Sequence, residues 1–335
     1  MNLIKSLCRV AVALALFAVA TESQAIPAFA RQVGVACTAC HFQHFPVLNE
    51  DGRAFKAGAF TLMRKNPKIE DEGLSLPLTL NLAFVTNLAY TKTNGNTNAL
   101  GGPTPYNKDV NNGQFQMTQY SLFMGGRVGE HMGFEGEVGL NEGAAALASV
   151  KFPFIYDTGR LKSGVVLFTT DGLGVAQGFE LMSTGASAVH LFNQQDMNAI
   201  SAQQYINTST PATGAAFVTS NKRFFVNFSK WMPDTLNGHQ NAPGDPGAGS
   251  PTSNYLRIGW FPGGLIPSVD LGVGVQVWSG TSSTINADVT PTPATFETKA
   301  TAIDAAHGAA AARHRPAALA APSASAADRA TLRVA

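Results

Sequence analysis

Apolar side chains recur at every second position in several segments of the chain, and this alternation constrains the fold more than any other feature. The clearest segment is residues 269–277, where Val and Leu alternate with Asp, Gly and Gln. A repeat of two places one kind of side chain on each face of a β-strand. The same alternation occurs at residues 78–88, 120–124, 132–140, 224–228 and 256–260. The chain is therefore expected to be mainly β, with antiparallel strands joined by turns.

Strands with one apolar face suit either an outer-membrane barrel, whose outside meets lipid, or a soluble sandwich, whose apolar face lies in a core. Only 13% of the residues are charged and 33 are Gly, a low charge content for a soluble enzyme. The linkers alternate between short turns and long polar loops such as residues 236–253, as in bacterial barrels. Aromatic residues near the segment ends are candidates for the girdles at the membrane interfaces: Tyr90, Trp231, Tyr255, Trp260 and Trp278. These features favour an outer-membrane antiparallel β-barrel of porin type over residues 76–290, with the soluble sandwich as the alternative.

The first 25 residues have the order of a secretory signal peptide. Lys5 and Arg9 precede an apolar run over residues 10–20, and Ser23-Gln24-Ala25 then offers the small residues that a signal peptidase needs, with cleavage after Ala25. The apolar run is too short to cross the ~30 Å hydrocarbon core as a helix. The mature chain is therefore expected to begin at Ile26, outside the cytoplasm. The net charge of +1 gives no indication of nucleic-acid binding.

The last segment, residues 291–335, is rich in Thr, Pro and Ala and shows no strand period. Such a composition is typical of disorder. We expect either a disordered tail or the product of an altered reading frame that shortens the barrel. Outer-membrane barrels commonly end in a strand with an aromatic last residue, whereas this chain ends Arg333-Val334-Ala335.

Two cysteines remain once the signal peptide, with Cys8, is removed: Cys37 and Cys40. In an exported protein, two cysteines three positions apart suit a small disulfide, half of a metal site, or the two thioether anchors of a haem. His41 follows directly and completes the C-x-x-C-H pattern of haem attachment. Thiols at the first and fourth positions of a helical turn point the same way, and the next histidine can bind the iron from below. The sequence therefore predicts one covalent haem c held by Cys37, Cys40 and His41, and an electron-transfer role.

The second axial ligand is less closely determined. His44 lies three residues after His41, so on one helix it would face the same side of the ring. Met63 is the nearest methionine, and a methionine ligand would raise the reduction potential. Met63 is therefore the candidate, with His44, water or a residue of the barrel lumen as alternatives.

Residues 26–75 are expected to form a small haem-binding segment with short helices. We expect a helix over residues 37–45 and a second helix capped by Asn49. Candidates for packing on the porphyrin are Phe42, Phe45 and Phe55, and candidates for binding its propionates are Arg31, Arg53 and Lys56. In the barrel region, Glu135 and Glu137 occupy the polar face, where they keep a lumen hydrated or attract a cation such as Fe(II). His239, in a long loop, is a weaker candidate.

The motif and its surroundings resemble a known family. The motif Cys37-Thr38-Ala39-Cys40-His41 is preceded by IPAFARQVGVA at residues 26–36 and followed by FQHFPVLNEDGRAFK at residues 42–56. This stretch is similar to the fused outer-membrane monohaem cytochrome c–porins of iron-oxidising bacteria. The resemblance is dense over residues 25–62 and beyond them concerns architecture. It implies an amino-terminal cytochrome in or under a porin barrel, with Cys37, Cys40 and His41 as haem anchors. Residues 76–290 have room for about ten strands, fewer than the family's barrel.

The resemblance also implies a function, that of an iron(II):cytochrome c oxidoreductase. Extracellular Fe(II) would be the electron donor and a periplasmic c-type cytochrome the acceptor, with the haem between them. Two alternatives stay open. One is a soluble periplasmic monohaem carrier with an added β-domain, and the other is a passive porin in which the C-x-x-C-H motif is incidental. A donor other than iron is a variant of the first function that sequence does not distinguish.

Overall fold

The computed structural model of the chain describes residues 27–42, 47–64, 66–78, 81–91, 114–141, 144–171, 173–182, 212–232, 253–263, 269–284 and 294–309. Two short α-helices and a 3-10 turn come first: α2 (Pro27–Val33), η1 (Cys37–Ala39) and α3 (Glu50–Ala57). A small hairpin follows, formed by β1 (Lys68–Asp71) and β2 (Leu74–Pro77). The described part of the chain is then almost entirely strand, so the expectation of a mainly β protein is confirmed.

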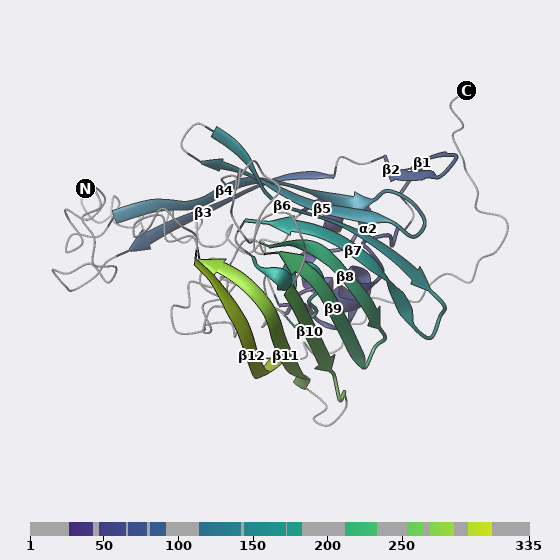
Figure 1. Cartoon of the computed structure of the whole chain (residues 1–335). Coiled ribbons are helices and arrows are strands. Elements are labelled where there is room, and N and C mark those ends of the chain that lie inside the picture. Colours follow the sequence, from purple (N-terminus) through teal and green to yellow (C-terminus); the bar gives the residue numbers. More distant parts are fainter. Residues whose placement is uncertain are drawn as a thin grey trace, which may run out of the picture.

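Ten strands form one large antiparallel sheet in which every strand pairs with its neighbour in sequence. They are β3 (Leu82–Thr91), β4 (Gln114–Arg127), β5 (Gly133–Asn141), β6 (Ala144–Asp157), β7 (Lys162–Thr170), β8 (Ala212–Ser220), β9 (Phe224–Met232), β10 (Ser253–Trp260), β11 (Val269–Thr284) and β12 (Ala294–Ala309). The sheet is strongly curved (Figure 1). Its edges are β3 and β12, which do not pair with each other among the described residues.

Strand β12 corrects the expectation for the carboxyl-terminal segment. Residues 291–335 were expected to carry no strand, yet residues 294–309 pair with β11 along their whole length. The alternation is hidden in the sequence because, of the outward residues Thr301, Ile303 and Ala305, only Ile303 is large and apolar. The inward Ala300, Ala302 and Ala306 pack against the core. Residues 310–335 lie outside the described part of the chain. The edge position of β12 explains why so weakly apolar a segment can still be a strand, since an edge strand pairs with only one neighbouring strand.

The two faces of the sheet differ: one carries buried polar side chains within an apolar core, and the other exposes large apolar side chains. We call the face covered by residues 173–182 and the amino-terminal helices the inner face, and the other the outer face. Fully buried polar side chains lie on the inner face, among them Asn227, Ser229, Arg257 and Gln276. Large apolar side chains stand exposed on the outer face: Phe84, Phe152, Phe154, Tyr156, Leu167, Phe217, Phe228, Ile258, Trp260, Val273, Val275 and Ile303. The period-two pattern thus predicted the two faces correctly.

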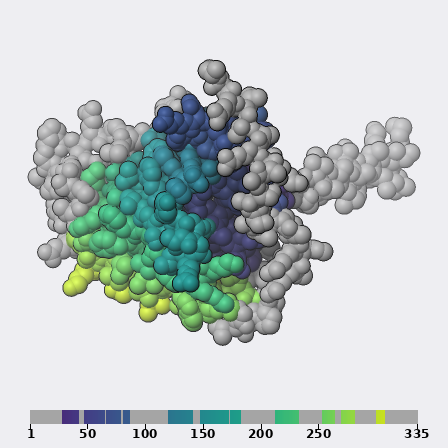
Figure 2. Space-filling model, turned by 90° about the vertical axis from the view of Figure 1, so that its right-hand side faces the viewer, coloured from purple at the N-terminus to yellow at the C-terminus, as the bar shows by residue number. Residues whose placement is uncertain are grey.

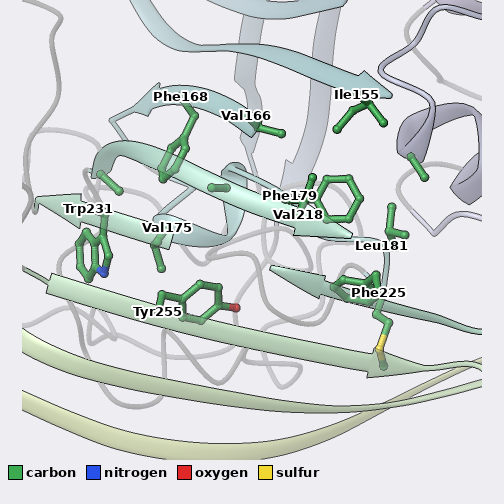
Figure 3. Close-up of a cluster of buried hydrophobic side chains, with 14 of the residues drawn as sticks. Ile155, Val166, Phe168, Val175, Phe179, Leu181, Val218, Phe225, Trp231 and Tyr255 are labelled. Carbon is green, nitrogen blue, oxygen red and sulfur yellow. The ribbon is translucent and has the colours of Figure 1, made fainter. Parts of the chain in front are cut away.

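Three of the proposed girdle aromatics are on the wrong face for that role. Trp231, Tyr255 and Trp278 point inward and are buried, whereas Trp260 is 54% exposed on the outer face. The reason is the parity of the strands: Tyr255 shares a face with Arg257, and Trp278 shares one with Gln276. The side chain of Tyr90 lies outside the described part of the structure. Figure 3 shows Trp231 and Tyr255 with the apolar core that covers the inner face.

The connections between strands have two lengths, as expected. Short turns join β4 to β5, β6 to β7, β8 to β9 and β10 to β11, and all of them lie at one end of the sheet (Figure 1). At the other end the connections include residues 92–113, 171–211 and 233–252. Two links at that end are shorter: residues 142–143 between β5 and β6, and residues 285–293 between β11 and β12. In Figure 2, which views the end with the short turns, the purple amino-terminal segment is framed by the teal and green strands.

Candidate functional site

The C-x-x-C-H motif forms a single tight turn. Within η1, the carbonyl oxygen of Cys37 accepts hydrogen bonds from the amides of Cys40 (3.1 Å) and His41 (3.0 Å). Cys37 and Cys40 are free, half-buried thiols on this one turn, with His41 next to them. Burial in the first place, and then the nearby Asp51 and Cys37, raise the pKa of the Cys40 thiol to about 11. Cys40 is therefore protonated at neutral pH.

The expected helix over residues 37–45 is wrong for the part that the structure describes. At His41 the chain leaves the turn: His41 forms an antiparallel bridge with Leu48, and the amide of Phe42 donates to Val47 O (3.0 Å). The cause is Asn49, whose amide binds Cys40 O and whose Nδ2 binds Ala39 O, both at 3.0 Å. A continuing helix would need those carbonyls for its own amides. His44 and Phe45 lie outside the described residues.

Helix α3 supports the motif from behind. Asn49 is its N-cap, as expected, and accepts a hydrogen bond from the Gly52 amide (3.0 Å). The first turn carries Glu50 and Asp51, whose negative charges interact favourably with the positive end of the helix dipole. Gly52 lies directly against the Cys40 carbonyl, where a Cβ atom would clash with Cys40 O and touch Leu48. The helix therefore fixes the backbone of the motif through a contact that only glycine permits.

An ion pair joins this helix to the far part of the sheet. Arg53 binds Asp270 of β11 (Nη2 to Oδ2, 2.8 Å), lies over the ring of Phe261 (4.2 Å to its centroid) and donates to Leu48 O (3.0 Å). The side chains of the pair are only 10% and 18% exposed. Arg53 is thus occupied in holding α3 on the inner face, so the idea that it binds a haem propionate loses support. The Arg31 guanidinium likewise donates to the carbonyl of Leu82.

Lys56 faces a second group of charges on the inner face. Lys151 of β6 pairs with Glu135 of β5 (3.1 Å), and both act electrostatically on Lys56, as does Glu180. Burial and the repulsion of Lys151 lower the pKa of Lys56 to about 8, against the opposing pull of Glu135 and Glu180. Glu135 points inward as predicted, and its partner is a lysine. Among the described residues, no three His, Cys, Asp or Glu side chains gather as a metal-binding group.

Aromatic packing fixes the rest of the amino-terminal segment. Phe29 stacks on Phe60 (4.8 Å between ring centroids) and meets Phe55 edge-on (5.3 Å). Phe55 therefore serves this small core, whereas Phe42 lines a pocket beside the motif. Gln32, fully buried, donates to Phe60 O and Leu62 O and accepts from the amide of Arg127 in β4.

Met63 follows this anchored stretch. Thr61 O accepts a hydrogen bond from Arg127 (2.9 Å), so the residues just before Met63 are held at the β4 side of the inner face. Met63 itself is half-buried. Its role as an axial ligand stays a prediction. His239 lies outside the described residues.

Sequence reasoning missed the segment that fills the inner face, residues 173–182. It leaves the end of β7, forms the turn η4 (Val175–Gln177) and is almost wholly buried. Glu180 binds the fully buried Arg257 of β10 (Oε2 to Nε, 2.9 Å), which also binds Asp304 of β12 (Nη2 to Oδ2, 2.8 Å). The sequence did carry a signal for this group, a charged residue at an inner-face position of β10 (Arg257) and of β12 (Asp304). No local pattern identified Glu180 as their partner.

The amino-terminal segment and the sheet meet at a pocket beside the motif. Phe42, Val47, Leu48 and Arg53 line it from the motif side. Leu181, Met182, Phe261, Asp270, Gly272 and Ala306 line it from the sheet side. Two thiols on one turn with an adjacent histidine are the donor set that a covalent haem requires, and Cys37, Cys40 and His41 would be its holders. The pocket itself is small and holds the Arg53–Asp270 ion pair, so haem attachment stays a prediction.

Among the described residues no helix is both long and apolar enough to cross a membrane. Comparison of the chain with protein-family models, with curated proteins and with solved structures finds no match.

Proposed function

We propose that this protein is an outer-membrane c-type cytochrome that takes electrons from extracellular Fe(II) and passes them through one covalent haem to a periplasmic carrier. One observation carries the proposal: the segment with the C-x-x-C-H motif packs on the inner face of the sheet, where buried polar side chains lie within an apolar core, while the outer face exposes large apolar side chains. This arrangement suits a redox group held inside a protein that is surrounded by lipid.

The outer face supports a membrane location. Trp260, Phe217 and Ile303 are 54%, 51% and 77% exposed, and further large apolar side chains cover neighbouring strands. Monomeric soluble proteins rarely expose a contiguous apolar surface of this extent. In lipid the same surface is stabilising, and the inward polar groups find partners inside. The alternative of a soluble periplasmic carrier is less consistent with this face. A membrane location also requires that the backbone edges of β3 and β12 be paired in a closed barrel.

The two ends of the sheet suggest an orientation. In bacterial outer-membrane barrels the short turns face the periplasm and the long loops face outward. Here α3 lies at the end with the short turns: Lys162 of the β6–β7 hairpin donates to Ala54 O (3.1 Å), and Asp270 begins β11 just after its turn. In this orientation the motif faces the periplasm, where a carrier can reach it, and Fe(II) approaches from the long loops.

In this function the residues of the chain would hold the haem, orient it and shield it from water. Cys37 and Cys40 would form the thioether bonds, and His41 would bind the iron. The haem, when bound, supplies a one-electron couple, so each Fe(II) that is oxidised to Fe(III) reduces one ferric centre. Asn49 and Gly52 fix the turn that carries these groups, and Arg53 ties it to β11. Residues 173–182 and the aromatic side chains of the inner face belong to the buried core, which also takes in Ala57 and Ala59 of the amino-terminal segment. The same packed segment speaks against a passive open pore.

The experiment is a reduction assay on isolated outer membranes. The exported protein is made together with the cytochrome c maturation system, and the haem absorption bands are followed while Fe(II) is added under argon. We expect covalent haem by intact mass in the outer-membrane fraction and prompt reduction of its bands by Fe(II).

The matched control is the Cys37→Ala, Cys40→Ala variant, which should insert into the membrane without covalent haem. If the wild-type protein carried no haem, a passive envelope protein would be the remaining interpretation. Haem-loaded protein that stays in solution without detergent would favour the soluble carrier, and haem that Fe(II) leaves oxidised would exclude iron as the donor.

A further inference from the structure

The outer face of the sheet changes in chemistry along the strands. At the end with the short turns, the last outward residues of β6 and β10 are Tyr156 (63% exposed) and Trp260 (54% exposed). Both side chains join a large apolar ring to one polar group. Farther from the turns, the large apolar side chains exposed on β6 to β10 have no polar atom: Phe152, Phe154, Leu167, Phe217, Phe228 and Ile258. We call Tyr156 and Trp260 the rim of the outer face.

A histidine packs against the tyrosine of the rim. The ring of His131, in the β4–β5 turn, lies 4.3 Å from the ring of Tyr156, and the carbonyl of His131 accepts a hydrogen bond from the amide of Ile155 (2.8 Å). The two turns next to this contact are charged, with Glu130 and Arg160 exposed. Tyrosine and tryptophan prefer such a position where hydrocarbon gives way to lipid headgroups, since their rings are apolar and their tips are polar.

We propose that the rim binds the headgroup region of the lipid leaflet at the short-turn end and so fixes the depth of the protein in the bilayer. The inference rests on the proposed membrane location and adds to it the level at which the sheet lies. Of the two rim residues, only Trp260 was expected at an interface from the sequence. Tyr156 is identified by its exposure and by its place at the end of β6.

The β6–β7 hairpin places helix α3 at the level of the rim. Asp157, which follows Tyr156, is the strand partner of Lys162. The amino group of Lys162 in turn donates to Ala54 O of α3 (3.1 Å). The carboxyl-terminal half of α3 is therefore bound to the sheet next to the rim.

Strand β11 gives α3 a similar level. Asp270, which binds Arg53 of α3, lies three residues before Val273, the strand partner of Trp260. At about 3.3 Å per residue, this contact lies about 10 Å along the strand from Trp260, on the side of the turns. The segment with the C-x-x-C-H motif, which packs on α3, would therefore lie at the headgroup level rather than in the middle of the bilayer.

Fluorescence quenching by brominated lipids measures the depth of the rim, because only one of the three tryptophans of the chain faces outward. The full-length chain with Cys37→Ala and Cys40→Ala has no haem to quench the tryptophans. It is inserted into phosphatidylcholine vesicles brominated either near the headgroup (shallow) or near the ends of the acyl chains (deep). We expect stronger quenching by the shallow bromines. This quenching should be lost in Trp260→Phe, because Trp231 and Trp278 are buried on the inner face.

Two further variants, both combined with Trp260→Phe, compare depths on the same face. Tyr156→Trp should be quenched mainly by the shallow bromines, and Phe217→Trp, near the middle of β8, mainly by the deep ones. Strongest quenching of Trp260 or of Tyr156→Trp by the deep bromines would overturn the inference, and so would a lack of quenching at these positions while Phe217→Trp is quenched. If Phe217→Trp is not quenched either, the outer face does not meet lipid and the proposed membrane location itself fails.

Discussion

Gly52 shows how one residue positions the candidate haem turn. Its Cα lies against the Cys40 carbonyl, so α3 can approach the motif closely only without a side chain there. Gly52→Ala should force the helix and the turn apart, at a cost of about 1–3 kcal/mol for an overpacked site. We expect a lower fraction of chains with covalent haem, measured by intact mass after export.

The control for Gly52 is Ala54→Gly in the same helix. Ala54 is exposed, so this change costs about 1 kcal/mol of helix propensity without touching the Cys40 carbonyl. Normal haem loading in Gly52→Ala would show that the contact does not hold the turn.

Lys56 is the residue whose charge depends most on its surroundings in this segment. Its pKa of about 8 lies below the ordinary value of 10.5 because burial and Lys151 oppose the charged form. Since the folded state releases its proton at a lower pH than the unfolded state, stability should rise with pH between about 8 and 10.5 and be constant below that window. Reductive methylation with a carbon-13 label allows the titration of this lysine to be followed by NMR, with Lys56→Arg to assign its signal.

Two variants check the cause of the Lys56 shift. Lys151→Gln should raise the pKa of Lys56, because it removes a repulsion, and Glu135→Gln should lower it further, because it removes an attraction. A midpoint near 10.5 in the wild type would mean that Lys56 is open to water.

At the scale of elements, the buried Arg257 joins three parts of the molecule: β10, β12 and residues 173–182. Arg257→Met would leave Glu180 and Asp304 as buried carboxylates without their cation, which costs on the order of 3–5 kcal/mol. We expect residues 173–182 to detach from the inner face, seen as faster hydrogen exchange of their amides in detergent.

Lys299→Met is the matched control for Arg257, because it removes a cation from an exposed position of β12. The triple variant Arg257→Met, Glu180→Gln, Asp304→Asn should recover part of the lost protection, since it removes the unpaired charges too. Unchanged exchange in Arg257→Met would show that apolar packing alone holds the segment.

The elements also show what the sequence can predict. Strands β3, β4, β5, β9, β10 and β11 and their faces followed from the period of two, because that period is a local property of the chain. Strands β6, β7, β8 and β12 were not identified in this way, and in β12 only Ile303 among the outward Thr301, Ile303 and Ala305 is large and apolar. The helix over the motif was wrong because Asn49, which lies outside the motif, takes the carbonyls that such a helix needs.

The candidate site divides in the same way. Cys37, Cys40 and His41 are identifiable because their spacing is itself the chemical requirement. Met182, Arg257 and Glu180 are brought together only by the curvature of the sheet and by a loop that turns inward. No local pattern of residue types marks such a loop.

For the whole molecule, the exposed apolar outer face of the sheet gives the sharpest test of where the protein resides. Phe217 is 51% exposed near the middle of β8, on the outer face. If that face meets lipid, Phe217→Lys places a charge near the centre of the bilayer and costs about 2–4 kcal/mol, whereas Phe217→Leu keeps the surface apolar and should be nearly neutral. In a soluble carrier the order reverses, because a lysine there would reduce an exposed apolar patch and improve solubility. Assembly into outer membranes, measured as the heat-modifiable fraction on gels, should therefore fall in Phe217→Lys and persist in Phe217→Leu. Two results would contradict a lipid-facing outer face: equal assembly of both variants, or a Phe217→Lys protein that is more soluble without detergent than the wild type. Either result would also remove the reason for placing the haem inside a membrane barrel.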